Sequence, residues 1–265
     1  MRITVGDYST NLATGGVPLG DGDRRLVLLI HGSGMDRSVW SQQTRFLAHH
    51  GYRAAAVDLP GHGETDGPAM TTIDDMSAWV AEVTRHLGSP AHLVGHSMGS
   101  LIVLAAAAAH PDAVASAVLI GVAATMPVHP DLQGAADDGD RLAGKFIAGW
   151  GHSSDQHLGG NPTPGLWMMG GTRAVLDRSP SGTLSLALAA CAAYHNAIEA
   201  ASAVAIPVTL ILGGEDRMTP RSGAQPLIDA LGNARVVELP KAGHMAMIEE
   251  PDVVRKAILA HLVRC

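Results

Sequence analysis

Short, continuously apolar runs that alternate with helical patterns are the feature that most restricts how this chain folds. The first run, Leu26–Ile30, reads LVLLI. Five similar runs follow it: Ala54–Val57, His92–Gly95, Ala117–Gly121, Val208–Leu212 and Arg235–Leu239. Such runs are typical of strands that are buried on both faces of a parallel sheet. With two weaker candidates, Ile3–Val5 and the residues around Leu12, they predict a mostly parallel, eight-stranded sheet.

Helical patterns fill most of the gaps between these runs. We predict helices over residues 38–50, 74–87, 97–110, 225–231 and 252–263. Ser38 and Asp74 are the expected N-caps of the first two helices, because their side-chain oxygens can accept from the free N–H groups of the first turn. The alternation of strand and helix predicts a doubly wound α/β fold.

The alternation stops between about Val122 and Val204, where no clear strand is found. Helical patterns return there in three pieces: Arg141–Trp150, Thr172–Asp177 and Ser181–Ala203. An insertion of this length is implausible as an unstructured loop within a compact domain. We therefore predict a helical cap, residues 122–204, inserted between the two parts of the core, residues 1–121 and 205–265.

The composition is that of a folded protein with one sizeable core. Of 265 residues, 46% are hydrophobic and 16% charged, which excludes a disordered chain. The net charge of -7 and the absence of a Lys/Arg cluster argue against nucleic-acid binding. The chain start lacks the apolar core of a signal peptide, and the longest apolar run, Leu101–Ala109, is too short to cross a bilayer. We expect a cytoplasmic protein with no membrane partner, and a homodimer is left open.

The strongest local motif is Gly95-His96-Ser97-Met98-Gly99, a G-x-S-x-G sequence between a strand candidate and a helix candidate. In a nucleophile elbow of this kind, a strand turns sharply into a helix and presents the serine hydroxyl, and small flanking residues avoid a clash. Ser97 is therefore the predicted nucleophile. A serine hydroxyl is a weak nucleophile and needs a neighbouring base.

His244 is the predicted base, selected by position from 14 histidines. It follows the last strand candidate, and the carboxyl ends of parallel strands are where functional groups gather in such sheets. The acid that orients the base is predicted to be Asp216, which follows the preceding strand candidate. The adjacent Glu215 is the alternative. We favour Asp216 because the later position agrees better with a loop that reaches toward His244.

Two backbone N–H groups are expected to stabilise the oxyanion. One belongs to Met98, directly after the nucleophile, and the other to Ser33, in the small-residue loop His31-Gly32-Ser33-Gly34. We expect His31 to brace this loop through hydrogen bonds rather than to take part in catalysis.

Five segments together identify a family: LVLLIHGSG, VDLPGHGET, LVGHSMGS, IPVTLILGGEDRMTP and AGHMAMIEEP. On these segments the chain resembles the α/β-hydrolase superfamily over nearly its full length. The resemblance implies the α/β-hydrolase fold, a triad of Ser97, His244 and Asp216, an oxyanion hole of two amides and a helical cap. Asp58 and His62 lie in a loop whose role in that family is structural as a rule.

Predicted substrate contacts come from the oxyanion loop and from the cap; they are Gly32, Gly34, Trp150, Trp167 and Met168. For the three cap residues, packing within the cap is an equally good explanation.

No metal or cofactor is predicted. His152 and His157 flank Asp155, but a Gly/Ser-rich loop without a third ligand favours a solvated loop over a metal site. The two cysteines, Cys191 and Cys265, suggest neither a disulfide framework nor a zinc site and are interpreted as incidental thiols.

The predicted activity is carboxylic ester hydrolysis, with a small ester or lactone and water as substrates. Dehalogenases and epoxide hydrolases of this fold use aspartate where this chain has Ser97, so both classes are disfavoured. Carbon–carbon bond hydrolases commonly carry Pro-Gly-Ala after the oxyanion loop and Trp after the catalytic His, whereas this chain has Met35-Asp36-Arg37 and Met245. Such a hydrolase, a cofactor-free haloperoxidase or perhydrolase, and a small-molecule receptor of the same fold are the alternatives.

Overall fold

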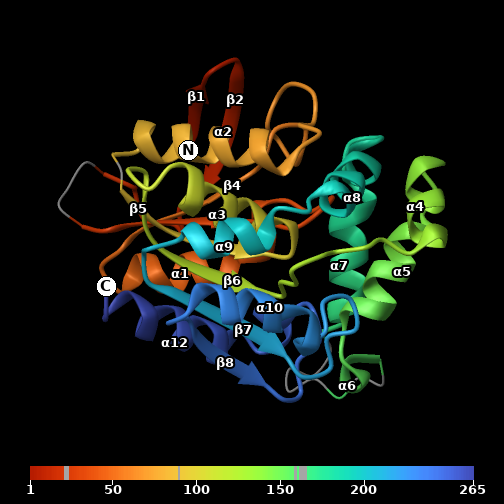
Figure 1. The fold of residues 1–265 in the computed structure, drawn as a ribbon. Coiled ribbons are helices and arrows are strands. Elements are labelled where there is room, and N and C mark those ends of the chain that lie inside the picture. Colours follow the sequence, from red (N-terminus) through yellow and green to blue (C-terminus); the bar gives the residue numbers. More distant parts are fainter. Residues whose placement is uncertain (21–23, 89, 158–159, 161–165) are drawn as a thin grey trace.

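The computed structural model describes residues 1–20, 24–88, 90–157, 160 and 166–265. This part of the chain contains an eight-stranded sheet with the strand order β1-β2-β4-β3-β5-β6-β7-β8 (Figure 1). The strands are β1 Arg2–Val5, β2 Tyr8–Ala13, β3 Leu26–Ile30, β4 Arg53–Val57, β5 Ala91–His96, β6 Val114–Ile120, β7 Val208–Gly213 and β8 Arg235–Leu239. The predicted strands are therefore confirmed.

The sheet is antiparallel at one edge and parallel elsewhere. β1 pairs antiparallel with β2, and β2 with β4, whereas the pairs from β4 through β3 and β5 to β8 are parallel. Strands β3 and β5 are buried at every residue. Successive side chains of β3 enter different cores, Leu28 on one face and Leu29 on the other. Burial on both faces explains why these strands read as continuous apolar runs.

Helices cover both faces of the sheet, as the doubly wound fold predicts (Figure 1). One core includes residues of α2 (Ile73–His86), α3 (Met98–Ala109) and α10 (Arg221–Leu231). The opposite core includes residues of the 3-10 helix η1 (Arg37–Trp40), α1 (Ser41–His49), α11 (Ala246–Glu249) and α12 (Pro251–Leu262).

Two predicted helix caps are wrong. The helical stretch that includes η1 and α1 is capped by Asp36 rather than Ser38, since the Asp36 carboxylate accepts from the N–H of Ser38 at 2.8 Å. Helix α2 is capped by Thr72 rather than Asp74, and the Thr72 hydroxyl accepts from the N–H of Asp75 at 3.0 Å. In both cases a side-chain oxygen two residues before the predicted cap accepts from a free N–H group of the first turn. The helical conformation therefore begins earlier than predicted.

The described residues between β6 and β7 form helices and no strand. The helices are α4 Pro130–Asp137, α5 Leu142–Gly151, α6 Ser154–His157, α7 Met168–Asp177, α8 Thr183–Ala193 and α9 Ala197–Ala203. Helices α4, α5, α7 and α8 lie together at one side of the sheet (Figure 1). The predicted helical piece Ser181–Ala203 consists of α8 and α9, and α9 packs against α3 and α10 of the core.

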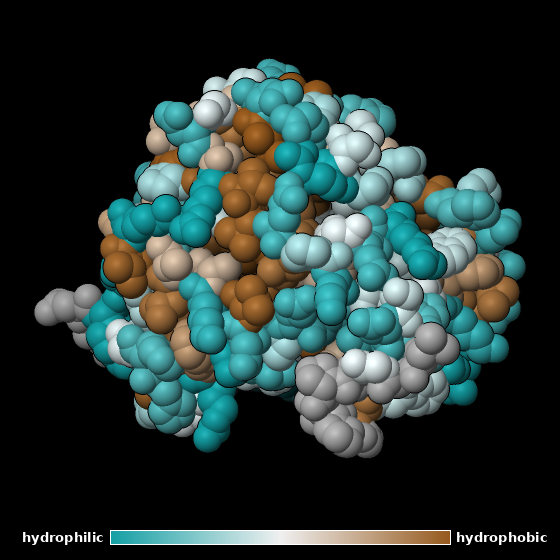
Figure 2. All heavy atoms as spheres, turned by 90° about the horizontal axis from the view of Figure 1, so that it is seen from below, coloured by the Kyte–Doolittle hydropathy of each residue, from teal (hydrophilic) through white to brown (hydrophobic). Residues whose placement is uncertain are grey.

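No helix in the described ranges is long and apolar enough to span a membrane. Figure 2 shows a band of apolar residues on the face seen from below, within a surface that is otherwise largely polar. Apolar area of this sort is a normal part of the surface of a folded protein.

Candidate active site

Ser97 occupies the sharp turn between β5 and α3. Its backbone has φ 54° and ψ -119°, and no other non-glycine residue in the described ranges has a positive φ. Such a conformation is strained for a residue with a Cβ, and backbone strain is concentrated at functional sites. The N–H of Ser97 donates to the carbonyl of Ile120 at 2.9 Å, which ties the turn to β6.

The glycines on either side of Ser97 are required by the closeness of the backbone. A Cβ on Gly95 would lie 2.2 Å from the carbonyl oxygen of Gly99, and a Cβ on Gly99 would lie 2.3 Å from that of Ile30. Neither position has room for a side chain. The motif therefore has the local geometry that a nucleophile elbow needs.

His244 and Asp216 form a buried pair. Nδ1 of His244 lies 2.9 Å from Oδ2 of Asp216. Oδ1 of Asp216 accepts from the N–H groups of Met218 at 2.9 Å and Thr219 at 2.8 Å. Burial raises the pKa of Asp216, but His244 and these hydrogen bonds outweigh it, so the net pKa lies below the usual range. An ionised carboxylate directed at Nδ1 is what an orienting acid must provide.

The neighbouring Glu215 has different partners. Its Oε2 accepts from the N–H of Ser154 at 2.9 Å and from the Ser154 hydroxyl at 2.7 Å, at the start of α6. Of these two adjacent acids, both of which the structure describes, Asp216 is therefore the one that contacts His244.

His96 lies against His244. Its Nε2 donates to the carbonyl of His244 at 2.9 Å, and the two ring centroids are 4.8 Å apart. Burial lowers the pKa of His96 to about 3, so its imidazole is neutral at neutral pH. No role was predicted for His96 from the sequence, although its position directly before Ser97 already placed it next to the predicted nucleophile.

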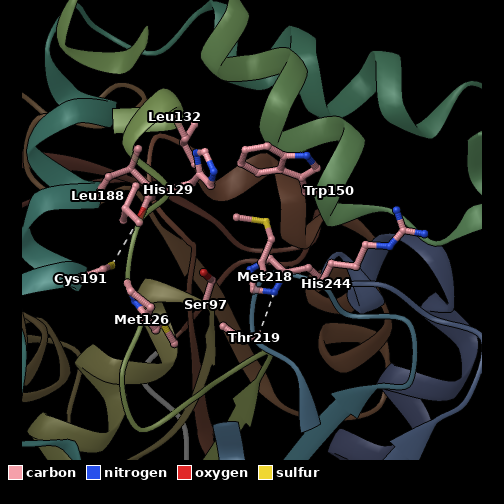
Figure 3. Close-up of a pocket in the computed structure, with 14 residues that line it drawn as sticks. Ser97, Met126, His129, Leu132, Trp150, Leu188, Cys191, Met218, Thr219 and His244 are labelled. Atoms are coloured by element: carbon pink, nitrogen blue, oxygen red, sulfur yellow. Dashed lines mark hydrogen bonds between the residues drawn. The ribbon is translucent and has the colours of Figure 1, made fainter. Parts of the chain in front are cut away.

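Ser97 and His244 line one cavity of about 340 Å³ (Figure 3). Much of the remaining lining is apolar, from Met126, Pro127, Val128, Leu132, Trp150, Leu188 and Met218. The other lining residues are Ser33, His129, Cys191, Arg217 and Thr219. A largely apolar cavity with a few convergent polar groups is typical of a small-molecule site.

The sequence model of the alpha/beta hydrolase family matches residues 27–257. The chain belongs to this family. A pimeloyl-(acyl-carrier protein) methyl ester esterase from Aromatoleum aromaticum is 30% identical to this hydrolase over 243 residues, covering 85% of this chain and 93% of the esterase. The crystal structure of the enol-lactonase from Burkholderia xenovorans LB400 has the same fold, with a TM-score of 0.87 and 23% identity, covering 99% of this chain and 100% of that chain.

A further relative is longer than this hydrolase. The dihydrolipoyllysine-residue acetyltransferase component of the acetoin cleaving system from Pseudomonas putida is 28% identical over 260 residues. The match covers 92% of this chain and 64% of that relative, so this hydrolase corresponds to a part of it.

Four of the predicted substrate contacts, Gly32, Gly34, Trp167 and Met168, do not line the cavity that holds Ser97. Gly32 packs against Ser97, where a Cβ on the glycine would lie 3.2 Å from the Cβ of Ser97, and Gly34 packs against α8. Trp167 is 62% exposed, and Met168 lines a separate groove. Both stand at the start of α7, which packs beside α5, and neither lines the cavity that holds Ser97.

Trp150 lines the cavity, and its contact with substrate stays a prediction, but most of the lining was not found from the sequence. Met126 and His129 come from the segment after β6, and Leu188 and Cys191 come from α8. Helix α8 is rich in Ala and Leu on all sides, so no apolar stripe indicates which residues face inward. Cys191 is thus part of the pocket wall rather than an incidental thiol.

The two predicted oxyanion residues lie near Ser97. Met98 is the first residue of α3, and Ser33 lines the same cavity as Ser97. N–H groups in the first turn of a helix have no intrahelical acceptor, which favours the binding of an anion. The roles of the two amides stay a prediction.

Hydrogen bonds from His31 brace the loop that carries Ser33. Nδ1 of His31 donates to the carbonyl of Gly32 at 2.9 Å, and Nε2 accepts from the N–H of Leu59 at 3.1 Å. Burial lowers the pKa of His31 to about 4, which keeps Nε2 available as an acceptor. These bonds agree with the bracing role that the sequence suggested.

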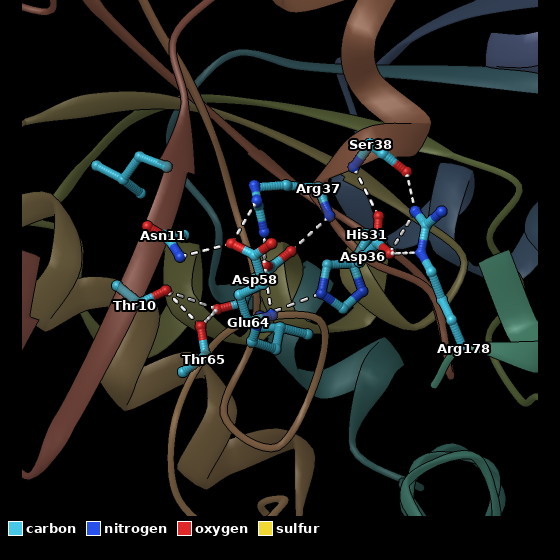
Figure 4. Close-up of polar contacts among 12 residues, drawn as sticks. Thr10, Asn11, His31, Asp36, Arg37, Ser38, Asp58, Glu64, Thr65 and Arg178 are labelled. Carbon is cyan, nitrogen blue, oxygen red and sulfur yellow. Dashed lines mark hydrogen bonds and ion pairs between the residues drawn. The ribbon is translucent and has the colours of Figure 1, made fainter. Parts of the chain in front are cut away.

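Charged residues extend this bracing (Figure 4). The buried Asp58 carboxylate accepts from the N–H of Arg37 at 2.7 Å and pairs with the Arg37 guanidinium. On the far side of the loop, Arg178 at the end of α7 donates to Asp36 at 2.8 Å. Asp58 thus holds Arg37 in place, and the end of α7 is tied to Asp36, which follows the loop that carries Ser33.

His152 is not in a solvated loop, contrary to the prediction. It is fully buried, and its Nε2 lies 2.9 Å from the hydroxyl oxygen of Thr172. It follows the end of α5 and lies against Thr172 of α7 and Glu249 of α11, which no local sequence signal indicates. Within the described ranges, no group of three or more His, Cys, Asp or Glu side chains is arranged to hold a metal ion.

Proposed function

We propose that this protein is a serine carboxylic ester hydrolase that acts on a small ester or lactone through an acyl-Ser97 intermediate. The 2.9 Å pairing of His244 with Asp216, beside a cavity that Ser97 also lines, carries the proposal. His244 takes the proton of the Ser97 hydroxyl as its oxygen attacks the carbonyl carbon, and then gives that proton to the leaving alcohol. Water then attacks the acyl carbon, and its proton passes through His244 back to Ser97.

Asp216 holds the imidazole at Nδ1 and stabilises the imidazolium that forms during each proton transfer. The N–H groups of Met98 and Ser33 donate to the oxyanion of the tetrahedral intermediate. The hydroxyl of Ser97 comes within hydrogen-bond reach of Nε2 of His244 in the reactive complex.

The cavity supports a compact, largely apolar substrate. Leu132, Trp150 and Leu188 contribute apolar walls from the helices between β6 and β7, and we propose that these helices act as a cap that determines acyl preference. The name of the 30% identical methyl ester esterase also favours an ester as substrate.

Hydrolysis of short p-nitrophenyl esters tests the proposal. Ser97→Ala is expected to lose turnover and fluorophosphonate labelling together, because one hydroxyl acts as nucleophile. Ser33→Ala is the matched control, since it removes a second serine hydroxyl from the same cavity and should still be labelled. Wild-type turnover by Ser97→Ala would falsify the assignment of the nucleophile.

The alternatives have distinct outcomes. Peracid formation from a carboxylic acid and hydrogen peroxide, without ester turnover, would indicate a perhydrolase. Cleavage of a carbon–carbon bond next to a ketone would indicate a hydrolase of that class. Saturable binding of a small molecule with no turnover of any ester would indicate a receptor.

A further inference from the structure

Glu249 is a buried carboxylate that the proposed chemistry does not use. It ends α11, shortly after the loop that carries His244, and it is 3% exposed. Burying a carboxylate is costly unless hydrogen-bond donors compensate for the lost water. The donors here are two backbone amides, one from Gly243, close to Glu249 in the sequence, and one from Ser153, far from it.

One amide belongs to the loop of the proposed base. The N–H of Gly243 donates to both oxygens of Glu249, at 3.2 Å each. The other belongs to the turn between α5 and α6, where the N–H of Ser153 donates to Oε2 at 3.0 Å. A single carboxylate therefore joins the residue before His244 to the helical segment between β6 and β7.

Two further contacts close the same junction. The N–H of Met245 donates to the carbonyl of Gly151 at 3.0 Å. A Cβ on Gly243 would lie 2.6 Å from the nitrogen of Ser153 and 2.8 Å from the carbonyl oxygen of Gly151. The residues on both sides of His244 are thus held against the turn at residues 151–153.

His152 completes the surroundings of the carboxylate. Its Nδ1 lies 3.6 Å from Oε1 of Glu249. Burial lowers the pKa of His152 to about 4, so at neutral pH the imidazole supplies no positive charge. Burial also raises the pKa of Glu249, while the bonds from Ser153 and Gly243 oppose that rise. Glu249 therefore acts mainly by placing two acceptor oxygens for the N–H groups of Gly243 and Ser153, and not by forming an ion pair with His152.

We propose that Glu249 is a positioning residue for His244. Its carboxylate sets the backbone of Gly243 and Met245 against the helical segment, and the imidazole, held at Nδ1 by Asp216, then presents Nε2 to Ser97. This inference rests on the proposed ester hydrolysis. Because a displacement of about 1 Å can cost a reaction about 10²-fold, the loss on removing Glu249 should fall on kcat rather than on KM.

Three substitutions separate acceptor placement from charge. Glu249→Gln keeps the length and an acceptor oxygen, Glu249→Asp keeps the charge but is one methylene shorter, and Glu249→Met keeps the length without acceptors. We expect kcat to fall in the order wild type, Gln, Asp, Met, with a loss of at least about 10-fold for Met and KM within about 2-fold. Glu250→Gln, at the adjacent carboxylate, is the matched control and should behave as wild type.

All assays are run well below the Tm of each variant, as measured by circular dichroism. An Asp variant with a kcat equal to or above that of the Gln variant would overturn the proposal, and this comparison stands even if the Met variant does not fold. Unchanged kcat with a lowered Tm would also overturn it, because the role of Glu249 would then be structural.

Ser97→Ala, measured in parallel, distinguishes the two proposals. If Ser97→Ala keeps its turnover, the proposed function has failed, and with it the role of Glu249. If Ser97→Ala is inactive while the Glu249 variants keep their kcat, the positioning role alone is overturned.

Discussion

The hydroxyl of Thr219 lies 2.7 Å from Oδ2 of Asp216, the same oxygen that pairs with Nδ1 of His244. This hydroxyl is also 3.1 Å from Nδ1 itself. Since the hydroxyl donates to the carboxylate, it helps to determine the direction in which Oδ2 faces. Thr219 is thus part of the geometry of the proposed acid–base pair.

Thr219→Val is expected to lower kcat/KM by about 3- to 10-fold, because a hydrogen bond to a charged group is lost while the backbone N–H bonds to Asp216 remain. Thr219→Ser keeps the hydroxyl and should stay near wild type. Steady-state ester hydrolysis measures both variants. Equal rates for the Val and Ser variants would show that the hydroxyl has no part in orienting Asp216.

Asp216→Asn keeps the size of the side chain but removes the charge that stabilises the imidazolium. By analogy with the serine-protease triad, we expect kcat to fall by at least about 10²-fold. Glu215→Gln should cost less than about 3-fold, because a partly solvated carboxylate interacts weakly with His244 through water. Rates are compared after circular dichroism has established native folding. A larger loss of kcat in Glu215→Gln than in Asp216→Asn would make Glu215 the orienting acid instead.

Leu188→Phe should shift the preference among p-nitrophenyl esters toward shorter acyl chains, since it adds volume to a cavity of about 340 Å³. We expect the ratio of kcat/KM for long and short esters to change by about 10-fold, the scale on which a pocket discriminates single methylenes. Trp167→Ala, on the exposed start of α7, is the control and should leave that ratio unchanged. A changed ratio for Trp167→Ala with an unchanged ratio for Leu188→Phe would mean that the acyl pocket lies elsewhere.

Buried histidines predict a loss of stability at mildly acidic pH. Burial lowers the pKa from 6.5 to about 4 for His31 and to about 3 for His62 and His96. As pH falls from 6.5 toward 4, the unfolded chain binds protons at these sites and the folded chain does not. The free energy of unfolding therefore decreases through this window, by up to about 1.4 kcal/mol per pH unit for each histidine.

Urea unfolding midpoints, measured from neutral pH down to the lower end of that window, check this prediction. The contribution of the three histidines is complete above pH 6.5 and is lost as the solution is acidified. His62→Gln should flatten the pH dependence, because it removes one of the proton acceptors of the unfolded state. A midpoint that stays constant across the window would contradict the burial argument.

The strands and the sharp turn at Ser97 could be predicted from the sequence because their signals are local. Burial on both faces requires continuous apolar residues, as in Leu26–Ile30, and the close backbone approach at the elbow requires glycine at positions 95 and 99. The positions of Asp216 and His244 after successive strands followed from the same pattern, since the carboxyl ends of parallel strands share one edge of the sheet.

Tertiary structure alone decided which side chains meet within the helical segment and around the loops. Glu215 and Asp216 are neighbours in sequence, yet one contacts Ser154 and the other His244. His152 is buried and Trp167 exposed, against the expectation from their surroundings in the chain. Such outcomes depend on how separate helices dock. Docking is set by the fit of many distant side chains, so no short stretch of sequence encodes it.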